Sequence, residues 1–371
     1  MKKNKALFAI SSLGLGHATR TLVVIHMYLL KDYEIDIISH GNALNYLKQE
    51  LVEKKVNFIE LIDYPHLERG NGFKFYIYLL IDLIKTKKLI ETENKFIKEI
   101  ESNYDFIFSD GKYGIYSKQI PSFLMSHQLS FIMPKGLSIF QNISDYFNKK
   151  YFKNFTKVFI PDYIDLSKSL SGKLSHTKMV NDLNHIYIGV LSSFYDNEET
   201  IKNFDKNKKI DYLFIISGYL IENKQNFIDK LLEEAKELDG KKVFVLGDTN
   251  KNYIKELENN ITIYANVSGK LRLDFFRNAG VIVSRSGYTT IMDCVELDKK
   301  AIFFPTKNQT EQEYLGYFLD KNKYFVIGND NSRLLDLVAN LEYIHGFNTI
   351  NKTKQALQLI EKEIDKYIIT T

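Results

Sequence analysis

A glycine-rich stretch with a histidine follows the first apolar run of the chain. Residues 12–20 read SLGLGHATR and come directly after Ala6–Ser11. Gly14 and Gly16 permit a tight turn and a close approach of the backbone to a ligand. The helix expected next would offer N–H groups and the positive end of its dipole to an anion. The third glycine of a dinucleotide-binding fingerprint and the Gly-Lys-Ser/Thr of a P-loop are both missing. His17 at the helix entry is a candidate general base, and an ordinary glycine-rich turn is the alternative.

A second cluster, Ser284–Asp293, follows the apolar run Val281–Val283 and again leads into an expected helix. Ser286, Gly287 and the next amides form a natural cradle for a diphosphate. Asp293 lies two turns into the helix, where a carboxylate can accept hydrogen bonds from two vicinal hydroxyls, as on a ribose. A simple capped turn is the plainer interpretation.

A third polar loop, residues 305–313, follows the apolar run Ile302–Phe304. Its donors and acceptors suit sugar hydroxyls and are carried by Gln309, Glu311 and Gln312. The alternative is a solvated helix start, with Thr310 as N-cap and Glu313 completing a capping box.

Two more apolar runs end in polar residues. Ser217 and Gly218 follow residues 214–216, and this pair alone indicates little. Asp110 ends the run Phe106–Ser109, where it could contact the acceptor or the base.

Short apolar runs alternate with longer amphipathic ones, which is typical of parallel α/β sheets. In the first half we expect strands at 6–11, 35–39, 56–61, 106–109, 123–125 and 158–160, and helices at 19–30, 43–54, 74–100 and 137–149. In the second half we expect strands at 212–216, 242–246, 261–264, 281–284, 301–304 and 325–327, and helices at 225–238, 270–278, 288–297, 311–321 and 332–341.

This pattern predicts two Rossmann-like domains whose parallel sheets face a central cleft. We expect the first domain at 1–190 and the second at 191–351, with a polar linker near 195–209. A final helix in 352–371 would cross back to the first domain. Ligands of such sheets bind at the carboxyl ends of strands. The polar loops described above lie there, and together they suit a nucleotide-sugar donor facing an acceptor.

Composition and charge exclude several classes of protein. The chain of 371 residues is 44% hydrophobic and 13% aromatic, so it can build substantial cores. Its 50 basic and 46 acidic side chains are too balanced for a typical nucleic-acid binder. The single cysteine, Cys294, fits a reducing compartment. No apolar stretch approaches the ~20 residues of a membrane helix, and the first apolar run is too short for a signal peptide. We therefore expect a cytoplasmic protein.

The motifs together resemble the inverting glycosyltransferases with the GT-B fold that are related to family 28. The best-known member of that family adds N-acetylglucosamine to the peptidoglycan lipid intermediate. The match is closest to a subgroup with a Gly-x-Gly-His-Ala-Thr-Arg loop, here residues 14–20. It covers nearly the whole chain and includes Ser126-His127-Gln128, residues 187–192 and residues 216–218. The chain departs from the peptidoglycan enzyme at Asp293, which replaces a glutamate, and at Glu313, which replaces a second glutamine.

The resemblance implies roles for individual residues. His17 would be the catalytic base, and His127 and Gln128 would face the acceptor on the same side as Asp110. Residues 264–267 would flank the nucleobase, largely through backbone. The implied donor-binding set is Gly14, Gly16, Ser217, Gly218, Ala265, Val267, Arg285, Ser286, Gly287, Tyr288, Thr289, Asp293, Gln309, Glu311 and Gln312.

The leading hypothesis is a metal-independent inverting glycosyltransferase that uses a nucleotide-diphosphate sugar, most simply a UDP-sugar. The acceptor would be a hydroxyl of a glycan or lipid-linked molecule in cell-envelope polysaccharide synthesis. We expect no cofactor, because no Asp-x-Asp pair occurs to bind a metal and diphosphate. Two alternatives remain open, a UDP-sugar epimerase of the same architecture and a nucleotide-binding regulatory module.

One segment suggests contact with a membrane surface. Phe73–Ile81 is rich in aromatic and aliphatic residues and leads into Lys85, Lys87 and Lys88. Such a helix could lie on an anionic lipid surface at the inner face of the cell membrane. A long core helix with a solvated basic end explains the same pattern.

Overall fold

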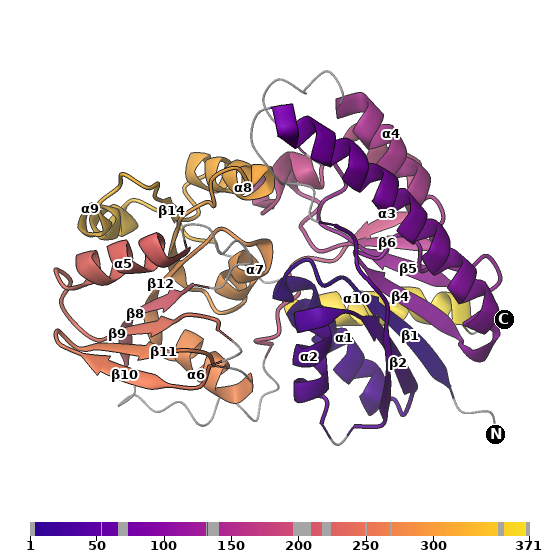
Figure 1. Ribbon diagram of the computed structural model, residues 1–371, viewed down its shortest axis with the longest axis horizontal. Helices are drawn as coiled ribbons and strands as arrows, with labels where there is room; N and C mark the ends of the chain where they lie inside the picture. Colours follow the sequence, from indigo (N-terminus) through magenta and orange to yellow (C-terminus); the bar gives the residue numbers. More distant parts are fainter. Residues whose placement is uncertain are drawn as a thin grey trace. The chain divides into compact units, whose positions relative to one another are not determined.

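The chain divides into two compact units, residues 1–193 with 351–371, and residues 194–350 (Figure 1). This computed structural model describes residues 4–52, 54–65, 73–130, 132, 141–195, 209–216, 224–248, 251–267, 269–347 and 352–368. We call the two parts unit 1 and unit 2.

Unit 1 is built on a seven-stranded sheet in which all neighbouring strands are parallel. Across the sheet the order is β3 (Val56–Glu60), β2 (Glu34–Ser39), β1 (Lys5–Ile10), β4 (Phe106–Asp110), β5 (Ser122–Met125), β6 (Lys157–Ile160) and β7 (His185–Tyr187). The α-helices of this unit are α1 (Leu15–Leu30), α2 (Gly41–Glu50), α3 (Phe73–Ile100), α4 (Gln141–Phe152) and α10 (Thr353–Ile368). Short 3₁₀ turns are η1 (Glu101–Asn103), η3 (Leu166–Lys168), η4 (Gly172–Leu174) and η5 (Lys178–Asp182).

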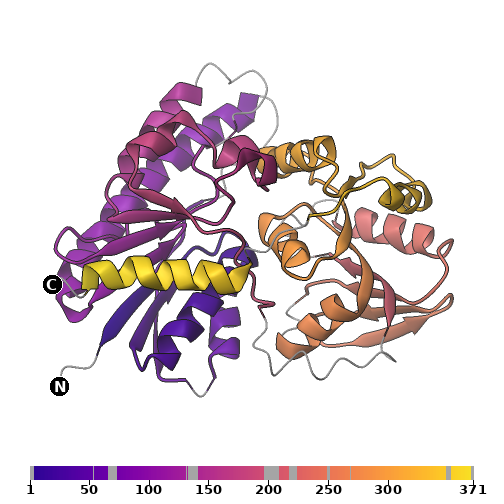
Figure 2. The ribbon, with the colours of Figure 1, turned by 180° about the vertical axis from the view of Figure 1, so that it is seen from behind.

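Helix α10 crosses one face of this sheet, opposite to α3 (Figure 2). Its apolar side buries Ala356, Ile360 and Ile364. Near its end, the Lys157 ammonium donates to Glu363 at 2.5 Å, and the Tyr367 ring packs edge-on against Phe123. The end of the chain is thus part of unit 1.

The core of unit 1 consists of aromatic rings on the central strands. Every residue of β4, and all but the first of β1, is buried, as expected for strands that are covered on both faces. The Phe8 and Phe108 ring centroids lie 5.5 Å apart, and Phe108 stacks on Phe159 at 6.0 Å. This packing fixes the ends of β1 and β4 relative to each other.

Unit 2 has a second seven-stranded sheet that is parallel except at one edge. Its order is β10 (Ile254–Leu257), β11 (Ile261–Tyr264), β9 (Lys242–Val245), β8 (Ile210–Ile215), β12 (Ala279–Ser284), β13 (Lys300–Phe303) and β14 (Val326–Ile327). The helices are α5 (Lys224–Ala235), α6 (Gly269–Asn278), α7 (Tyr288–Glu296), α8 (Thr310–Lys321) and α9 (Leu334–Ala339), followed by the 3₁₀ turn η8 (Asn340–Glu342).

The expected α/β class with two parallel sheets is confirmed. Two strands were not predicted, β7 and the antiparallel edge strand β10. The sequence of β10 is IKEL and its first three residues are exposed, so it carries no apolar run. The helix expected at 137–149 is observed from Gln141 to Phe152, and residues 137–140 lie outside the described part of the chain.

Both sheets have a point where the chain reverses the direction in which it adds strands. In unit 1 this point lies between β1 and β4, and in unit 2 it lies between β8 and β12. Loops at the carboxyl ends of such neighbouring strands diverge and leave room for a ligand. The loops after β1, β4 and β12 carry most of the chemistry described next.

Candidate active site

His17 lies in the first turn of α1, directly after the glycine-rich loop. Gly14 precedes the helix with a φ of +100°, a conformation that favours glycine. The Thr19 hydroxyl donates to the carbonyl of Gly16 at 3.2 Å and braces the turn. Arg20 follows His17 by three residues, so both side chains lie on one face of α1.

Asp110, the last residue of β4, meets both of these side chains. Its Oδ1 lies 2.7 Å from Nδ1 of His17, and its Oδ2 accepts from Nε of Arg20 at 2.7 Å. Nη2 of Arg20 also donates to Oδ1, which makes the ion pair bidentate. The Thr21 hydroxyl donates to Oδ2 at 2.8 Å. Of the two roles expected for Asp110, the structure shows contact with the candidate base.

The charge of Asp110 is stabilised in place. Burial of this completely enclosed carboxyl raises its pKa, but Arg20 and His17 outweigh burial and hold the pKa well below its usual range. The group is therefore an anion at neutral pH. A carboxylate only accepts hydrogen bonds, so Nδ1 of His17 must carry a proton that it donates to Asp110. In the neutral ring, Nε2 then has the lone pair that a general base needs.

Gly111 leaves room for the His17 ring. An added Cβ would lie 3.0 Å from Cβ of Ser11 and 3.1 Å from Cε1 of His17, and φ at this residue is +77°. A side chain here would push on the imidazole and strain the backbone.

A second buried cluster holds the loop after β1. The Asp63 carboxylate accepts from the Ser11 hydroxyl at 3.0 Å and from the backbone N–H of Ser12. Lys112 is completely buried and lies 3.2 Å from Asp63 and 2.7 Å from Glu93. Burial raises the Asp63 pKa, but Lys112 and the backbone donors hold it below its usual value. In the turn 110–112, Asp110 therefore supports His17, and Lys112 supports the glycine-rich loop through Asp63.

His127 and Gln128 follow β5 and belong to one turn. Nδ1 of the buried His127 lies 3.2 Å from Nη1 of Arg20, so this ring joins the His17 cluster. The N–H of Gln128 donates to the Ser126 hydroxyl at 3.2 Å, which shapes the turn. The half-buried Gln128 has no described contact with the His17 ring.

In unit 2, α7 begins at Tyr288 without a side-chain cap on its N-terminus. Its N-cap residue is Gly287, and Thr289 is half-buried in the first turn, whereas the Tyr288 side chain is buried. The Ser286 hydroxyl is buried and donates to the carbonyl of Gln312 at 3.0 Å. Ser286 thereby ties this turn to α8, and anion binding here would rest on backbone amides and the helix dipole.

Arg285 holds the loop that follows β13. Its guanidinium carbon lies 3.6 Å from the Phe227 ring centroid, and Nη1 donates to the carbonyls of Phe304 and Pro305 at 3.3 and 3.4 Å. Burial lowers the pKa of this group. Through these contacts Arg285 supports the loop after β13, and its expected part in donor binding stays a prediction.

The loop before α8 is folded back by its own side chains. The N-cap is Gln309, not the expected Thr310, and Glu313 accepts from the N–H of Asn308 at 3.0 Å. The Gln312 amide accepts from the N–H of Thr306 at 3.0 Å and donates to the Gln309 amide oxygen. The simple capping box was wrong, because the helix starts at Thr310, one residue earlier than that box requires. Glu311 lies half-buried in the same first turn.

Asp293 is completely buried in α7 and pairs with Arg272 of α6 at 3.3 Å. The Arg272 guanidinium also lies over the rings of Phe194 and Phe276. The role expected for Asp293, accepting hydrogen bonds from a ribose, stays a prediction; in this structure its carboxylate faces Arg272.

The expected nucleobase residues divide into two cases. The buried Ala265 uses its N–H on the carbonyl of Tyr253 at 3.0 Å and its carbonyl on the N–H of Asp248 at 2.8 Å. Val267 is half-buried beyond the end of β11. Ser217 and Gly218 lie outside the described residues.

A family match covers much of the second half of the chain. Residues 223–366 match the sequence model described as the glycosyltransferase family 28 C-terminal domain. None of the curated proteins matches this sequence.

Solved structures share the whole architecture at low identity. The crystal structure of Acinetobacter baumannii MurG matches with a TM-score of 0.56 and 14% identity, covering 97% of this chain and 99% of that one. The spinosyn rhamnosyltransferase SpnG, complexed with thymidine diphosphate, gives 0.61 and 12%, covering 98% and 96%. Phytolacca americana UGT2, complexed with UDP-2-fluoro-glucose and pterostilbene, gives 0.61 and 13%, covering 99% and 95%. The chain is a glycosyltransferase with the GT-B fold.

Several residues of this glycosyltransferase were missed in the sequence. Arg20, Thr21, Asp63 and Lys112 were not singled out, although all four support His17 or its loop. The spacing of His17 and Arg20 on one helix face was a usable signal. The sequence contains no such signal for Asp63 and Lys112, because their contact depends on how distant loops fold.

Within the residues that the structure describes, no three His, Cys, Asp or Glu side chains group as a metal site would require. Among the described helices, none has the length and apolar character needed to cross a membrane.

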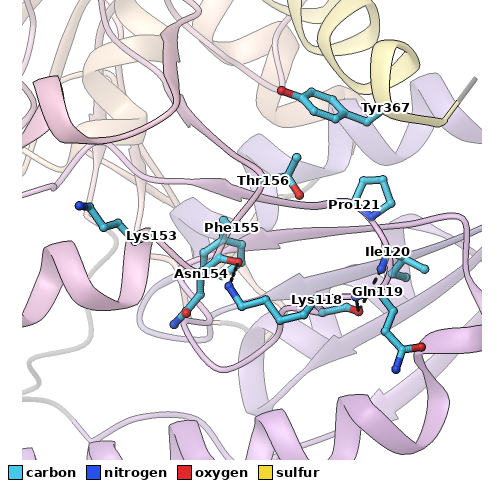
Figure 3. A pocket seen from close by; sticks show the side chains of 10 residues that line it. Lys118, Gln119, Ile120, Pro121, Lys153, Asn154, Phe155, Thr156 and Tyr367 are labelled. Carbon is cyan, nitrogen blue, oxygen red and sulfur yellow. Dashed lines mark hydrogen bonds between the residues drawn. The ribbon is translucent and has the colours of Figure 1, made fainter. Parts of the chain in front are cut away.

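A shallow cavity of about 390 Å³ is lined in part by Lys118, Lys153 and Tyr367 (Figure 3). Its lining includes Pro121 and Thr156, which directly precede β5 and β6. It is therefore at the amino ends of these strands, whereas His17 and Asp110 are at carboxyl ends. The cavity is not part of the candidate active site.

Proposed function

We propose that this protein is an inverting glycosyltransferase that moves a sugar from a UDP-sugar to a hydroxyl of a glycan or lipid-linked acceptor. The observation that carries the proposal is the buried Asp110 carboxylate against Nδ1 of His17. This contact leaves Nε2 of a neutral imidazole as a base at the carboxyl end of the central strands.

In the proposed reaction, the acceptor oxygen attacks the anomeric carbon from the face opposite the departing diphosphate. The new C–O bond forms as the bond to the diphosphate breaks, and the acceptor proton moves to Nε2 of His17. The imidazolium that forms is stabilised by Asp110. One displacement inverts the configuration of the sugar.

Unit 2 is proposed to bind the donor. The start of α7 at Gly287 and Thr289 would stabilise the negative charge of the diphosphate through amides and the helix dipole. Gln309, Glu311 and Gln312 would bind the sugar of the donor, and Val267 would lie beside its nucleobase. The thymidine diphosphate in SpnG and the UDP-sugar in UGT2 support a pyrimidine nucleotide. Asp293 would reach a ribose only after Arg272 moves aside.

The acceptor side is proposed to work at the inner face of the cell membrane. Helix α3 exposes Ile81, Leu83 and Ile84. Three exposed lysines, Lys85, Lys87 and Lys88, follow on the same helix. Apolar and cationic side chains together favour reversible contact with anionic lipid.

A thermal-shift screen with UDP-, dTDP- and GDP-sugars tests the donor assignment. A ligand at 100 times its Kd stabilises the folded state by about 2.7 kcal/mol. We expect UDP compounds to raise the melting temperature most. Stabilisation by GDP compounds alone would contradict the proposed pyrimidine nucleobase of the donor. An epimer formed from a UDP-sugar without acceptor would contradict the transfer reaction.

A further inference from the structure

Arg20 touches both histidines of the cluster and the carboxylate. Its side chain is only 2% exposed. Nε and Nη2 donate to Asp110, Nη1 lies 3.2 Å from Nδ1 of His127, and Nη2 lies 3.0 Å from Nδ1 of His17. A guanidinium has five N–H donors and no acceptor, so each of these contacts limits where its partner can carry a proton.

Nδ1 of His17 and Nδ1 of His127 face groups of opposite hydrogen-bonding character. Nδ1 of His17 lies against a carboxylate oxygen, which only accepts, so this nitrogen carries a proton. The nearby Nη2 of Arg20 then contributes charge and no hydrogen bond to that nitrogen. Nδ1 of His127 faces Nη1 of Arg20, which only donates, so this nitrogen carries the lone pair.

We propose that Arg20 is a positioning residue that holds His17 and His127 in opposite tautomers. His17 then offers the lone pair of Nε2 to the acceptor proton, and His127 carries its proton on Nε2. Proton uptake at Nε2 of His17 rests on the proposed function, whereas the tautomers themselves do not.

Nitrogen NMR of the protein with ¹⁵N-labelled histidine tests the tautomers without any assay. The signals are assigned with the single variants His17→Gln and His127→Gln. Above pH 8 we expect a proton on Nδ1 of His17 and on Nε2 of His127. The same tautomer in both rings, or the reverse pattern, overturns the proposal, and neither result depends on the reaction.

Variants of Arg20 separate positioning from folding. In Arg20→Met, His127 should become a mixture of tautomers, because the donor that faces its Nδ1 is lost. Arg20→Lys should leave His127 mixed as well, because an ammonium keeps the charge but lacks the planar fork that places Nη1 against that nitrogen. Thr21→Val, which also loses a bond to Asp110, should keep both tautomers. An unchanged His127 tautomer in folded Arg20→Met overturns the assignment.

Discussion

Nδ1 of His17 lies 2.7 Å from Oδ1 of Asp110, although the two residues are 93 positions apart in the chain. They meet because β1 and β4 are neighbours in the sheet, with Ile10 opposite Asp110 in the register. His17 follows β1 and Asp110 ends β4, so both lie at the point where strand order reverses. In a parallel sheet this is where ligands bind.

Replacing His17 by Ala removes the proposed base and leaves unit 2 untouched. We expect kcat to fall by about 10²–10⁴-fold, the usual contribution of a positioned general base. The affinity for the nucleotide should stay nearly constant. Asp110→Asn should also lower kcat, because an asparagine can present an N–H to His17 and disturb the tautomer. Turnover and UDP binding, measured on the same samples, check both expectations.

The matched control for this pair is Thr21→Val, which loses one hydrogen bond to Asp110 and no group on His17. Wild-type turnover in His17→Ala would remove His17 from the mechanism.

Acid should weaken the fold through Asp110. Its pKa is depressed in the folded state, so its contribution to stability is present above the unfolded pKa of about 3.9 and is lost as the pH falls toward the folded pKa. We expect the difference in unfolding free energy between the wild type and Asp110→Asn to be constant from pH 8 to 5. Below pH 4 it should shrink by up to about 1.4 kcal/mol per pH unit. Denaturant titrations at pH 7, 5, 4 and 3 measure this difference, and a constant value down to pH 3 would show that the carboxyl is not stabilised as an anion.

The sequence predicted the sheets well because their strands are apolar and buried, as in residues 6–10 and 106–110. It also placed His17, Ser286 and Gln309 at strand ends, since each follows an apolar run directly. These features are local, so one stretch of sequence reports them.

What it could not predict depends on distant loops. Asp63 and Lys112 meet inside the protein, and Arg272 covers Asp293 from a separate helix. No spacing encodes such pairs. The edge strand β10 escaped notice for another reason, because its exposed residues need no apolar pattern.

Gly111→Ala should displace the His17 ring without changing any chemical group on it. The new methyl would press on Cε1 of His17, and the positive φ would cost about 1–2 kcal/mol. We expect lower stability and at least a tenfold fall in kcat, since a small misplacement of a reacting group is costly. Gly346→Ala is the matched control, because Gly346 has a φ of +65° and an added Cβ would meet nothing within 4 Å. Equal kcat in both variants would mean that the His17 ring tolerates the methyl.

Lys112→Met should destabilise unit 1 strongly. It leaves the carboxylates of Asp63 and Glu93 buried without their cation, which costs about 3–5 kcal/mol in comparable pairs. Lys112→Arg should recover part of this loss. The control is Lys242→Met in unit 2, where a buried ammonium donates to the carbonyl of Leu238 at 2.7 Å. Denaturant unfolding compares the three variants, and an equal loss from Lys242→Met would argue against a special role for the Asp63–Lys112 pair.

The last prediction concerns lipid binding by α3. Lysines near an anionic membrane contribute about 1 kcal/mol each, screened by salt. We expect the protein to bind vesicles that contain anionic lipid, less strongly at high salt, and much less after Lys85, Lys87 and Lys88 are changed to Glu. Each substitution changes the charge by −2, so the formal net charge falls from +4 to −2.

A control with the same net charge replaces the exposed Lys241, Lys251 and Lys255 of unit 2 by Glu. If net charge alone governed binding, both triple variants would lose affinity equally in a vesicle sedimentation assay. A loss confined to the α3 variant assigns the contact to this helix, whose lysines follow the exposed Ile81, Leu83 and Ile84. Undiminished binding by the α3 variant would contradict membrane docking through α3 and would favour a soluble acceptor.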